Sequence, residues 1–213
     1  TGKLPVGVYA KDVILYVIGS VKADFGVYKA VEFTGPVVKE LSISERMALC
    51  NMSTEMGCKA AYIQPDEVTF AYLKEHGITD YTVYETDPDY IYDADLTYDV
   101  KQLTPQVAVP FSVDNVFPIV NEEGIPVNQA YLGSCTGGRT PDFAIAAKIL
   151  KGKHIAEGTR MILVPASKKV LEECMEKGYI KTLLEAGATL TAPGCAACLG
   201  IHQGLLAEGE ACI

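Results

Sequence analysis

The chain has 213 residues, of which 49% are hydrophobic and 21% charged, a balance that excludes wholesale disorder and a fibrous repeat. Its formal net charge of −9 would repel a phosphate backbone, so we expect no nucleic-acid partner. The longest apolar run, residues 13–21, is shorter than the roughly 20 residues of a spanning helix, and no signal-peptide pattern precedes it. These observations predict a cytoplasmic protein with no membrane partner.

Helical and strand patterns alternate along the first part of the chain. The clearest helix begins with the capping-box pair Ser42 and Glu45 and has Gly57 as its C-terminal stop. In chain order, we predict a helix over 10–21, a strand over 28–33, a helix over 42–57, a strand over 60–64 and a helix over 65–77.

An acidic tract, residues 79–100, interrupts this alternation. It contains seven Asp and Glu residues, no Lys or Arg, and five of the 12 tyrosines. We interpret it as a solvated connector with aromatic anchors. Prolines punctuate the segment that follows the tract, so we expect a domain boundary near residue 102.

The second half alternates more regularly between strands and helices, which predicts parallel βαβ units and an α/β fold. We expect Thr140 to cap one helix and Ser167 to cap a helical stretch that reaches Gly187. The predicted elements are strands over 129–132, 161–165 and 188–191, with helices over 140–152 and 167–187. In such sheets, the loops at the carboxyl ends of the strands carry the ligand.

Three of the seven cysteines, Cys135, Cys195 and Cys198, follow predicted strands. An odd number of cysteines cannot all pair, and we expect reduced thiols. Three thiolates on turns that lead into helices suit an iron–sulfur cluster with one open iron site. Their spacing alone also allows a zinc site completed by His202 or Cys212, a redox dithiol, or no metal.

Other candidate residues carry weaker signals. Asn51 and Glu55 are one helical turn apart and could present an amide and a carboxylate to a site, although such a pair is more often surface decoration. We interpret Cys50, Cys58 and Cys174 as structural thiols within or beside helices.

Five segments, in this order, resemble the aconitase superfamily and, within it, the large subunits of 3-isopropylmalate dehydratases. They are residues 8–15, 46–55, 131–139 (Tyr-Leu-Gly-Ser-Cys-Thr-Gly-Gly-Arg), 193–200 (Pro-Gly-Cys-Ala-Ala-Cys-Leu-Gly) and 206–210. The resemblance covers essentially the whole chain. It implies two aconitase-like three-layer α/β domains with mostly parallel sheets, over 1–102 and 103–213.

The resemblance also implies a reaction and its groups. Cys135, Cys195 and Cys198 would hold a [4Fe–4S] cluster, Glu55 matches the family's active-site glutamate, and Asn51 matches an asparagine near the cluster. The implied enzyme is a hydro-lyase that dehydrates and rehydrates a small hydroxy diacid in leucine biosynthesis. Its expected partner is the swivelling domain of a small subunit.

The sequence departs from the family pattern at several points. Gly137 stands where the family has Asn, and Ala196-Ala197 stand where it has Gly-Pro. Because family segments expected on either side are absent, the resemblance predicts a central fragment that is inactive alone. We expect Arg139 to stabilise the Cys135 turn or to pair with an acid. The alternatives are a homoaconitase or dimethylmalate dehydratase large subunit, or a non-catalytic thiol-binding or zinc-binding α/β module.

Overall fold

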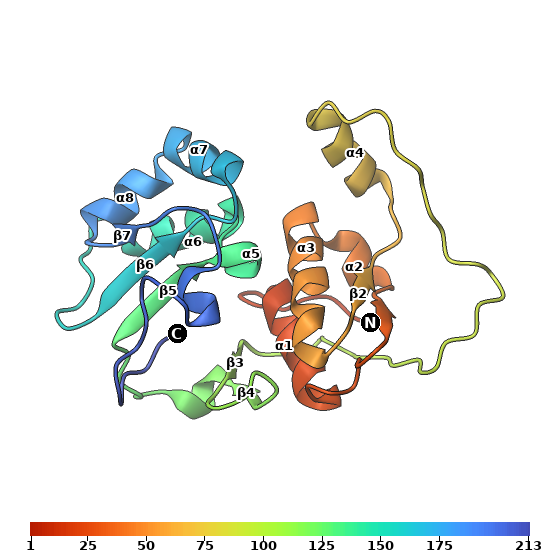
Figure 1. Cartoon of the computed structure of the whole chain (residues 1–213), viewed down its shortest axis with the longest axis horizontal. Coiled ribbons are helices and arrows are strands. Elements are labelled where there is room, and N and C mark those ends of the chain that lie inside the picture. Colours follow the sequence, from red (N-terminus) through yellow and green to blue (C-terminus); the bar gives the residue numbers. More distant parts are fainter. The chain divides into compact units, whose positions relative to one another are not determined.

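Parallel strand pairing organises both halves of the chain, which confirms the predicted α/β fold. The computed structural model describes residues 1–213, the side chain of Ala196 excepted, as two units, Thr1–Glu123 and Gly124–Ile213 (Figure 1). In the first unit β1 (Ala30–Glu32) pairs with β2 (Ala60–Tyr62) in parallel. In the second, three parallel strands form a sheet in the order β5-β6-β7.

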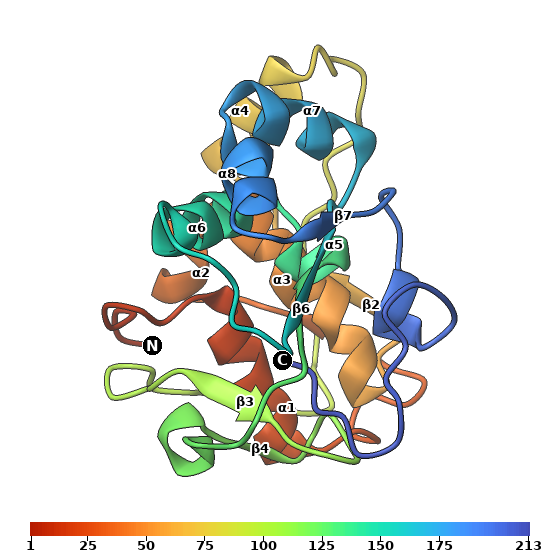
Figure 2. The same ribbon diagram turned by 90° about the vertical axis from the view of Figure 1, so that its left-hand side faces the viewer.

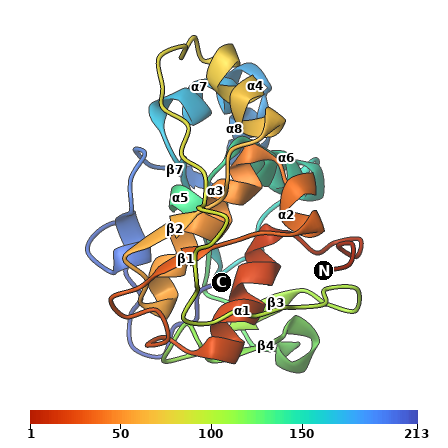
Figure 3. The ribbon, with the colours of Figure 1, turned by 90° about the vertical axis from the view of Figure 1, so that its right-hand side faces the viewer.

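The core of the first unit forms around α1 (Ala10–Val21), whose bounds agree with the prediction. Ile14 and Ile18 are fully buried on its inner face and pack with Leu49 of α3 (Ile43–Met52). Figure 3 shows α1 and α3 beside the β1–β2 pair. The remaining helices of this unit are α2 (Pro36–Glu40), which was not predicted, and α4 (Glu67–Glu75).

The capping box predicted for α3 is present. The Glu45 carboxylate accepts from the backbone N–H of Ser42 at 3.0 Å, and the Ser42 hydroxyl accepts from the backbone N–H of Glu45 at 3.4 Å. The α-helix ends at Met52 and continues as a 3-10 turn, η1 (Ser53–Met56). Gly57 then stops it in the left-handed conformation, with φ 84°.

The first unit extends to Glu123, beyond the boundary predicted near residue 102. The segment that follows the acidic tract, which is punctuated by prolines, contains an antiparallel hairpin, β3 (Gln106–Ala108) and β4 (Val116–Pro118), followed by η2 (Ile119–Glu122). The hairpin packs on α1, where the Asp12 carboxylate accepts from the Gln106 N–H at 2.8 Å. This packing makes residues 103–123 part of the first unit.

Residues 79–100 form neither helix nor strand. Tyrosines tie this acidic tract to the rest of the first unit: Tyr92 hydrogen-bonds to the Glu32 carboxylate, and Tyr98 to the Ser20 hydroxyl at 2.8 Å. The backbone carbonyl of Tyr84 accepts from the Tyr62 hydroxyl.

The sheet of the second unit consists of β5 (Gln129–Gly133), β6 (Arg160–Val164) and β7 (Thr189–Leu190). Helices cover one face, where Phe143, Leu163 and Leu183 are fully buried (Figure 2). These helices are α6 (Thr140–Leu150), α7 (Lys168–Glu176) and α8 (Tyr179–Glu185).

Two helix boundaries of this unit correct the predictions. The N-cap of α6 is Arg139 rather than Thr140, whose hydroxyl instead donates to the Glu173 carboxylate of α7 at 2.6 Å. Ser167 caps α7 as predicted, but Gly178, with φ 74°, divides the expected helical stretch into α7 and α8.

The C-terminal segment, residues 195–213, covers the other face of this sheet, where Ile162 and Val164 are buried (Figure 2). Gly204 lies directly on Ile162: a Cβ at this position would stand 2.4 Å from Ile162 Cδ1. Beyond it, Cys212 bridges Gln129 in parallel register at the outer edge of β5. Among the described residues, no helix has both the length and the apolar character to cross a membrane.

Candidate functional site

The first predicted ligand, Cys135, lies on a sharp turn at the carboxyl end of β5. Ser134 makes this turn with a left-handed backbone, φ 68°, and begins the short helix α5 (Ser134–Gly137). Ser134 is buried and Cys135 is exposed, so the turn brings the thiol to the surface. Arg139 Nε donates to the Cys135 carbonyl at 3.0 Å, which confirms the expected role of Arg139.

Glycine allows this turn to lie close against β6. A Cβ at Gly138 would stand 2.5 Å from the Val164 carbonyl oxygen and 2.6 Å from that of Ser134. In addition, the Ala166 N–H donates to the Gly138 carbonyl at 2.8 Å. The position of Cys135 is therefore fixed by backbone contacts to two strand ends.

The other two predicted ligands, Cys195 and Cys198, lie on the loop after β7, at the same edge of the sheet. This loop contains a single 3-10 turn, η3 (Ala196–Leu199), closed by the Cys198 N–H donating to the Cys195 carbonyl at 2.9 Å. Both thiols are exposed.

Tyr131 of β5 brings the three cysteines into one neighbourhood. Its hydroxyl donates to the Cys195 carbonyl at 2.9 Å. Burial, with smaller contributions from the charges of Cys198, Cys195 and Cys135, raises the pKa of Tyr131 to about 12. The phenol therefore stays protonated near neutral pH and can donate to the Cys195 carbonyl.

The three cysteines are of the ligand type that a [4Fe–4S] cluster takes. All three thiols are exposed and lie on the loops after β5 and β7, and none of the chain's cysteines forms a disulfide as the structure describes them. In the described part of the chain, no three His, Cys, Asp or Glu side chains are gathered closely enough for a single metal ion. A [4Fe–4S] cluster spreads its cysteine ligands over different irons, so its sulfurs lie farther apart than the ligands of one ion.

A charged network fixes the C-terminal segment behind the cysteine pair. Both guanidinium ends of Arg160 bind the Glu210 carboxylate, at 2.6 and 2.5 Å, and its Nε donates to the fully buried Gln129 at 2.7 Å. Gln129 in turn donates to the Gly204 carbonyl at 2.8 Å. The hydrogen bonds from Arg160 lower the pKa of Glu210 to about 2.

The two predicted catalytic residues lie in the first unit. Asn51 is partly buried in the last turn of α3, where its backbone carbonyl accepts from the Thr54 hydroxyl at 3.0 Å. Glu55 is exposed on η1. The α-helix ends at Met52 and a 3-10 turn follows, so Asn51 and Glu55 do not lie on one continuous α-helix. The expectation that they share a face, which assumed α-helical spacing, therefore does not hold on that ground.

The remaining cysteines divide by burial. Cys58 and Cys174 are buried, as expected for structural thiols, and burial raises the pKa of Cys174 to about 11. Cys50 is partly buried, and burial raises its pKa as well. Cys212 is exposed, and its sulfur accepts from the Gln129 amide at 3.4 Å.

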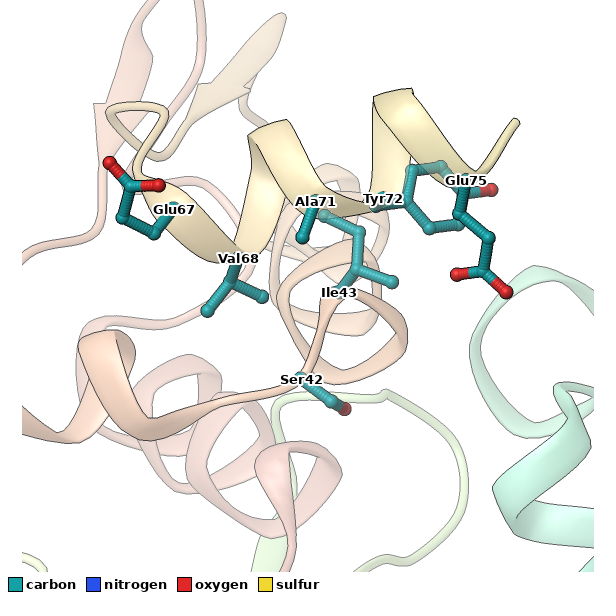
Figure 4. A pocket seen from close by; sticks show the side chains of 7 residues that line it. All are labelled: Ser42, Ile43, Glu67, Val68, Ala71, Tyr72 and Glu75. Carbon is teal, nitrogen blue, oxygen red and sulfur yellow. The ribbon is translucent and has the colours of Figure 1, made fainter. Parts of the chain in front are cut away.

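The first unit also has hollows that contain none of the predicted site residues. One, of about 460 Å³, lies between the start of α3 and one face of α4. Figure 4 shows Ile43 facing Val68, Ala71 and Tyr72 there. A second, of about 400 Å³, lies between α1 and the segment around residues 99–118. We assign no role to either.

Sequence reasoning missed the position of Tyr131. The residue opens the motif at 131–139, but the side chain itself received no role. The available signal was alternation along the strand: Tyr131 and Gly133 are two residues apart and face the same side, which leaves space above the glycine for the ring.

Known proteins are similar to this chain along its whole length. The family model described as the aconitase family (aconitate hydratase) matches residues 1–213. The 3-isopropylmalate dehydratase large subunit 1 of Methanopyrus kandleri is 49% identical over the whole chain, which covers 51% of that protein. The 2,3-dimethylmalate dehydratase large subunit of Eubacterium barkeri is 42% identical, again over the whole chain and 51% of the relative.

A protein of Methanosarcina mazei described as a probable methanogen homoaconitase large subunit is 46% identical over the whole chain and 54% of its own length. The chain therefore spans about half the length of these relatives.

Proposed function

Because the chain belongs to the aconitase family, we propose that it is part of the large subunit of a cytoplasmic hydro-lyase of the 3-isopropylmalate dehydratase type. Within that enzyme it would carry the three cysteine ligands of a [4Fe–4S] cluster. As part of the proposal, its two units correspond to two successive aconitase-like domains.

One observation carries the cofactor assignment: Cys135, Cys195 and Cys198 come from the loops after β5 and β7, and the Tyr131 hydroxyl of β5 donates to the Cys195 carbonyl of the other loop. The other thiols are distributed differently, because Cys58 and Cys174 are buried and Cys212 is engaged at the edge of β5. Three cysteine ligands leave one iron of the cluster open to substrate. When bound, the cluster supplies Lewis-acid chemistry at that iron.

The chain's own residues have supporting tasks in this proposal. The Cys135 turn, fixed by Arg139 and by close packing at Gly138, holds one ligand rigidly. The Arg160–Glu210–Gln129 network holds the segment that follows the other two. Rigid support of this kind orients ligands before the metal group binds.

We assign Glu55 to proton transfer at the reacting hydroxyl or water, and Asn51 to its support. The exposed carboxylate of Glu55 meets the requirement that a general acid or base be reachable from solvent or substrate. These two roles rest on the family motif at residues 46–55.

The proposed substrate is 3-isopropylmalate or a similar branched or extended hydroxy diacid, and the proposed partner is a small subunit with the swivelling domain. Relatives named for 3-isopropylmalate, homoaconitate and dimethylmalate enzymes support this class. The identity of 49% to a 3-isopropylmalate dehydratase large subunit favours the first substrate.

Anaerobic reconstitution of the 213-residue chain with iron and sulfide tests the cofactor proposal. We expect a brown protein with about four irons and four sulfides per chain. Each of Cys135→Ala, Cys195→Ala and Cys198→Ala should abolish loading, whereas the control Cys212→Ala, in the same unit and also exposed, should retain it. Stoichiometric zinc without sulfide, or equal damage from Cys212→Ala in a folded protein, would refute the ligand assignment.

A further inference from the structure

We propose that Tyr131 is a positioning residue, which holds the Cys195–Cys198 turn beside Cys135 through its phenol hydroxyl. This inference rests on the proposed cluster site, because it assigns a role in arranging the ligands of that site. Tyr131 itself is not offered as a ligand or as a group that reacts.

The direction of the Tyr131 ring is set by its strand. Tyr131 pairs with Ile162 and Gly133 with Val164 in the parallel register, so these residues share one face of the sheet. A Cβ at Gly133 would lie 3.2 Å from Tyr131 Cζ. The ring therefore leans over the glycine, toward the carboxyl end of β5 where the Cys135 turn begins.

The hydroxyl at the end of this ring contacts the backbone of the cysteine turn. It donates at 2.9 Å to the Cys195 carbonyl, the same carbonyl that accepts from the Cys198 N–H and so closes the turn. The turn between the two cysteines is a single 3-10 turn, and both flanking thiols are exposed. So short and exposed a turn has little packing of its own, and a hydrogen bond to a residue anchored in the sheet restricts it.

The same strand therefore positions all three cysteines. Cys135 lies two residues beyond the end of β5, and Tyr131 connects β5 to the other pair. Ligands that are held in place before the metal group arrives bind it with less loss of conformational freedom. Phenylalanine would keep the ring on Gly133 but would remove the donor that connects the Cys195 carbonyl to the sheet.

Hydrogen–deuterium exchange of the chain without cluster provides the first test. We expect Tyr131→Phe to speed exchange of the amides in residues 195–200 about fivefold to tenfold, the factor for one lost hydrogen bond. The exchange rates of the β6 amides should not change, and this result would show that the fold is intact. Tyr179→Phe is the matched control, since it removes a phenol hydroxyl from the helix-covered side of the same unit.

The second test uses reconstituted protein and follows loss of iron and sulfide on exposure to air. We expect Tyr131→Phe to load the cluster but to lose it at least about threefold faster than wild type or Tyr179→Phe. Replacing Tyr131 by 4-aminophenylalanine, which keeps a donor at the same place, should restore wild-type retention. If Tyr131→Phe unfolds, 4-aminophenylalanine and 4-methylphenylalanine at this position make the same comparison at equal size.

The outcomes separate the two proposals. If the wild-type chain takes up no cluster while exchange at 195–200 still rises in Tyr131→Phe, the cofactor assignment fails but the hydroxyl does hold the turn. If wild type loads the cluster and Tyr131→Phe matches it in exchange or in retention, the positioning role is wrong.

Discussion

At the scale of single residues, thiol chemistry separates the cysteines. Cys58 and Cys174 are buried, and burial raises the pKa of both. The thiolate is the reactive form, so we predict that alkylation near neutral pH modifies the four exposed cysteines, Cys135, Cys195, Cys198 and Cys212, well before these two. Mass spectrometry of native protein, with urea-unfolded protein as control, measures the order. Equal rates at Cys174 and Cys135 in the native chain would contradict the described burial.

The Arg160–Glu210 pair predicts how stability depends on pH. The folded-state pKa of Glu210 is lowered to about 2 from an ordinary value of 4.5. A carboxyl group with a depressed pKa stabilises the fold above its unfolded pKa, and this contribution is lost as the pH falls toward the folded value. The second unit should therefore lose stability between about pH 4.5 and pH 2.

Thermal unfolding at a series of pH values checks this expectation. Glu210→Gln should lower the melting temperature at neutral pH and flatten its fall in that acidic window. Glu208→Gln, at an exposed neighbouring position, should leave the profile unchanged. If the melting temperature of Glu210→Gln falls as steeply with decreasing pH as that of the wild type, other groups control the loss of stability in acid.

At the scale of elements, one ion pair connects the helices of the first unit. Arg46 of α3 is buried, and its guanidinium binds both oxygens of Asp66 at 2.6 and 2.8 Å and the carbonyls of Leu41 and Lys39. Asp66 also caps α4 by accepting from the Val68 N–H at 3.0 Å. One carboxylate therefore serves both as an ion-pair partner and as a helix cap.

We predict that Asp66→Ala lowers the free energy of unfolding of the first unit by about 3 kcal/mol, because it leaves a buried guanidinium without its carboxylate and removes a cap. Denaturant unfolding measures the loss. Glu67→Ala, one residue along and exposed, should cost less than about 0.5 kcal/mol. A similar cost for both variants would mean that the pair contributes little.

Elements whose ends are set by neighbouring residues could be predicted from the sequence, and elements that depend on distant contacts could not. The Ser42–Glu45 capping box and the glycine stop at Gly57 are local, and both are present. The hairpin β3–β4 was missed because its three-residue strands are stabilised by packing on α1, which no short sequence window records. The N-cap of α6 moved to Arg139 because the Thr140 hydroxyl binds Glu173, 33 residues away.

Prediction of the candidate site met the same limit: residues placed by a local pattern were found, and a contact between distant segments was not. The motif predicted which cysteines follow strands, and the loops after β5 and β7 carry them. The link between those loops through Tyr131 depends on strand register and on space above Gly133, which only the folded sheet defines.

At the scale of the whole molecule, we predict that the 213-residue chain has no dehydratase activity by itself, even with a cluster. Binding a diacid requires cations, and the chain's three arginines are engaged elsewhere: Arg46 with Asp66, Arg139 with the Cys135 carbonyl, and Arg160 with Glu210. The family's serine base would come from the proposed swivelling partner.

An anaerobic assay for formation of the unsaturated diacid checks this prediction, first with the chain alone and then with a small subunit and a full-length large subunit. Turnover by the chain alone would place the whole catalytic apparatus within its 213 residues.

The end of the C-terminal segment has a further consequence for association between molecules. The Tyr131 N–H donates to the Ile213 carbonyl at 2.7 Å, and the Ile213 N–H donates to the Gln129 carbonyl at 3.0 Å, so residues 212 and 213 pair with β5 around the isolated parallel bridge at Cys212. Unpaired strand edges recruit strands from other chains and promote aggregation. The segment that follows the cysteine pair thus occupies backbone groups at the outer edge of β5, which would otherwise be open to a strand from another molecule.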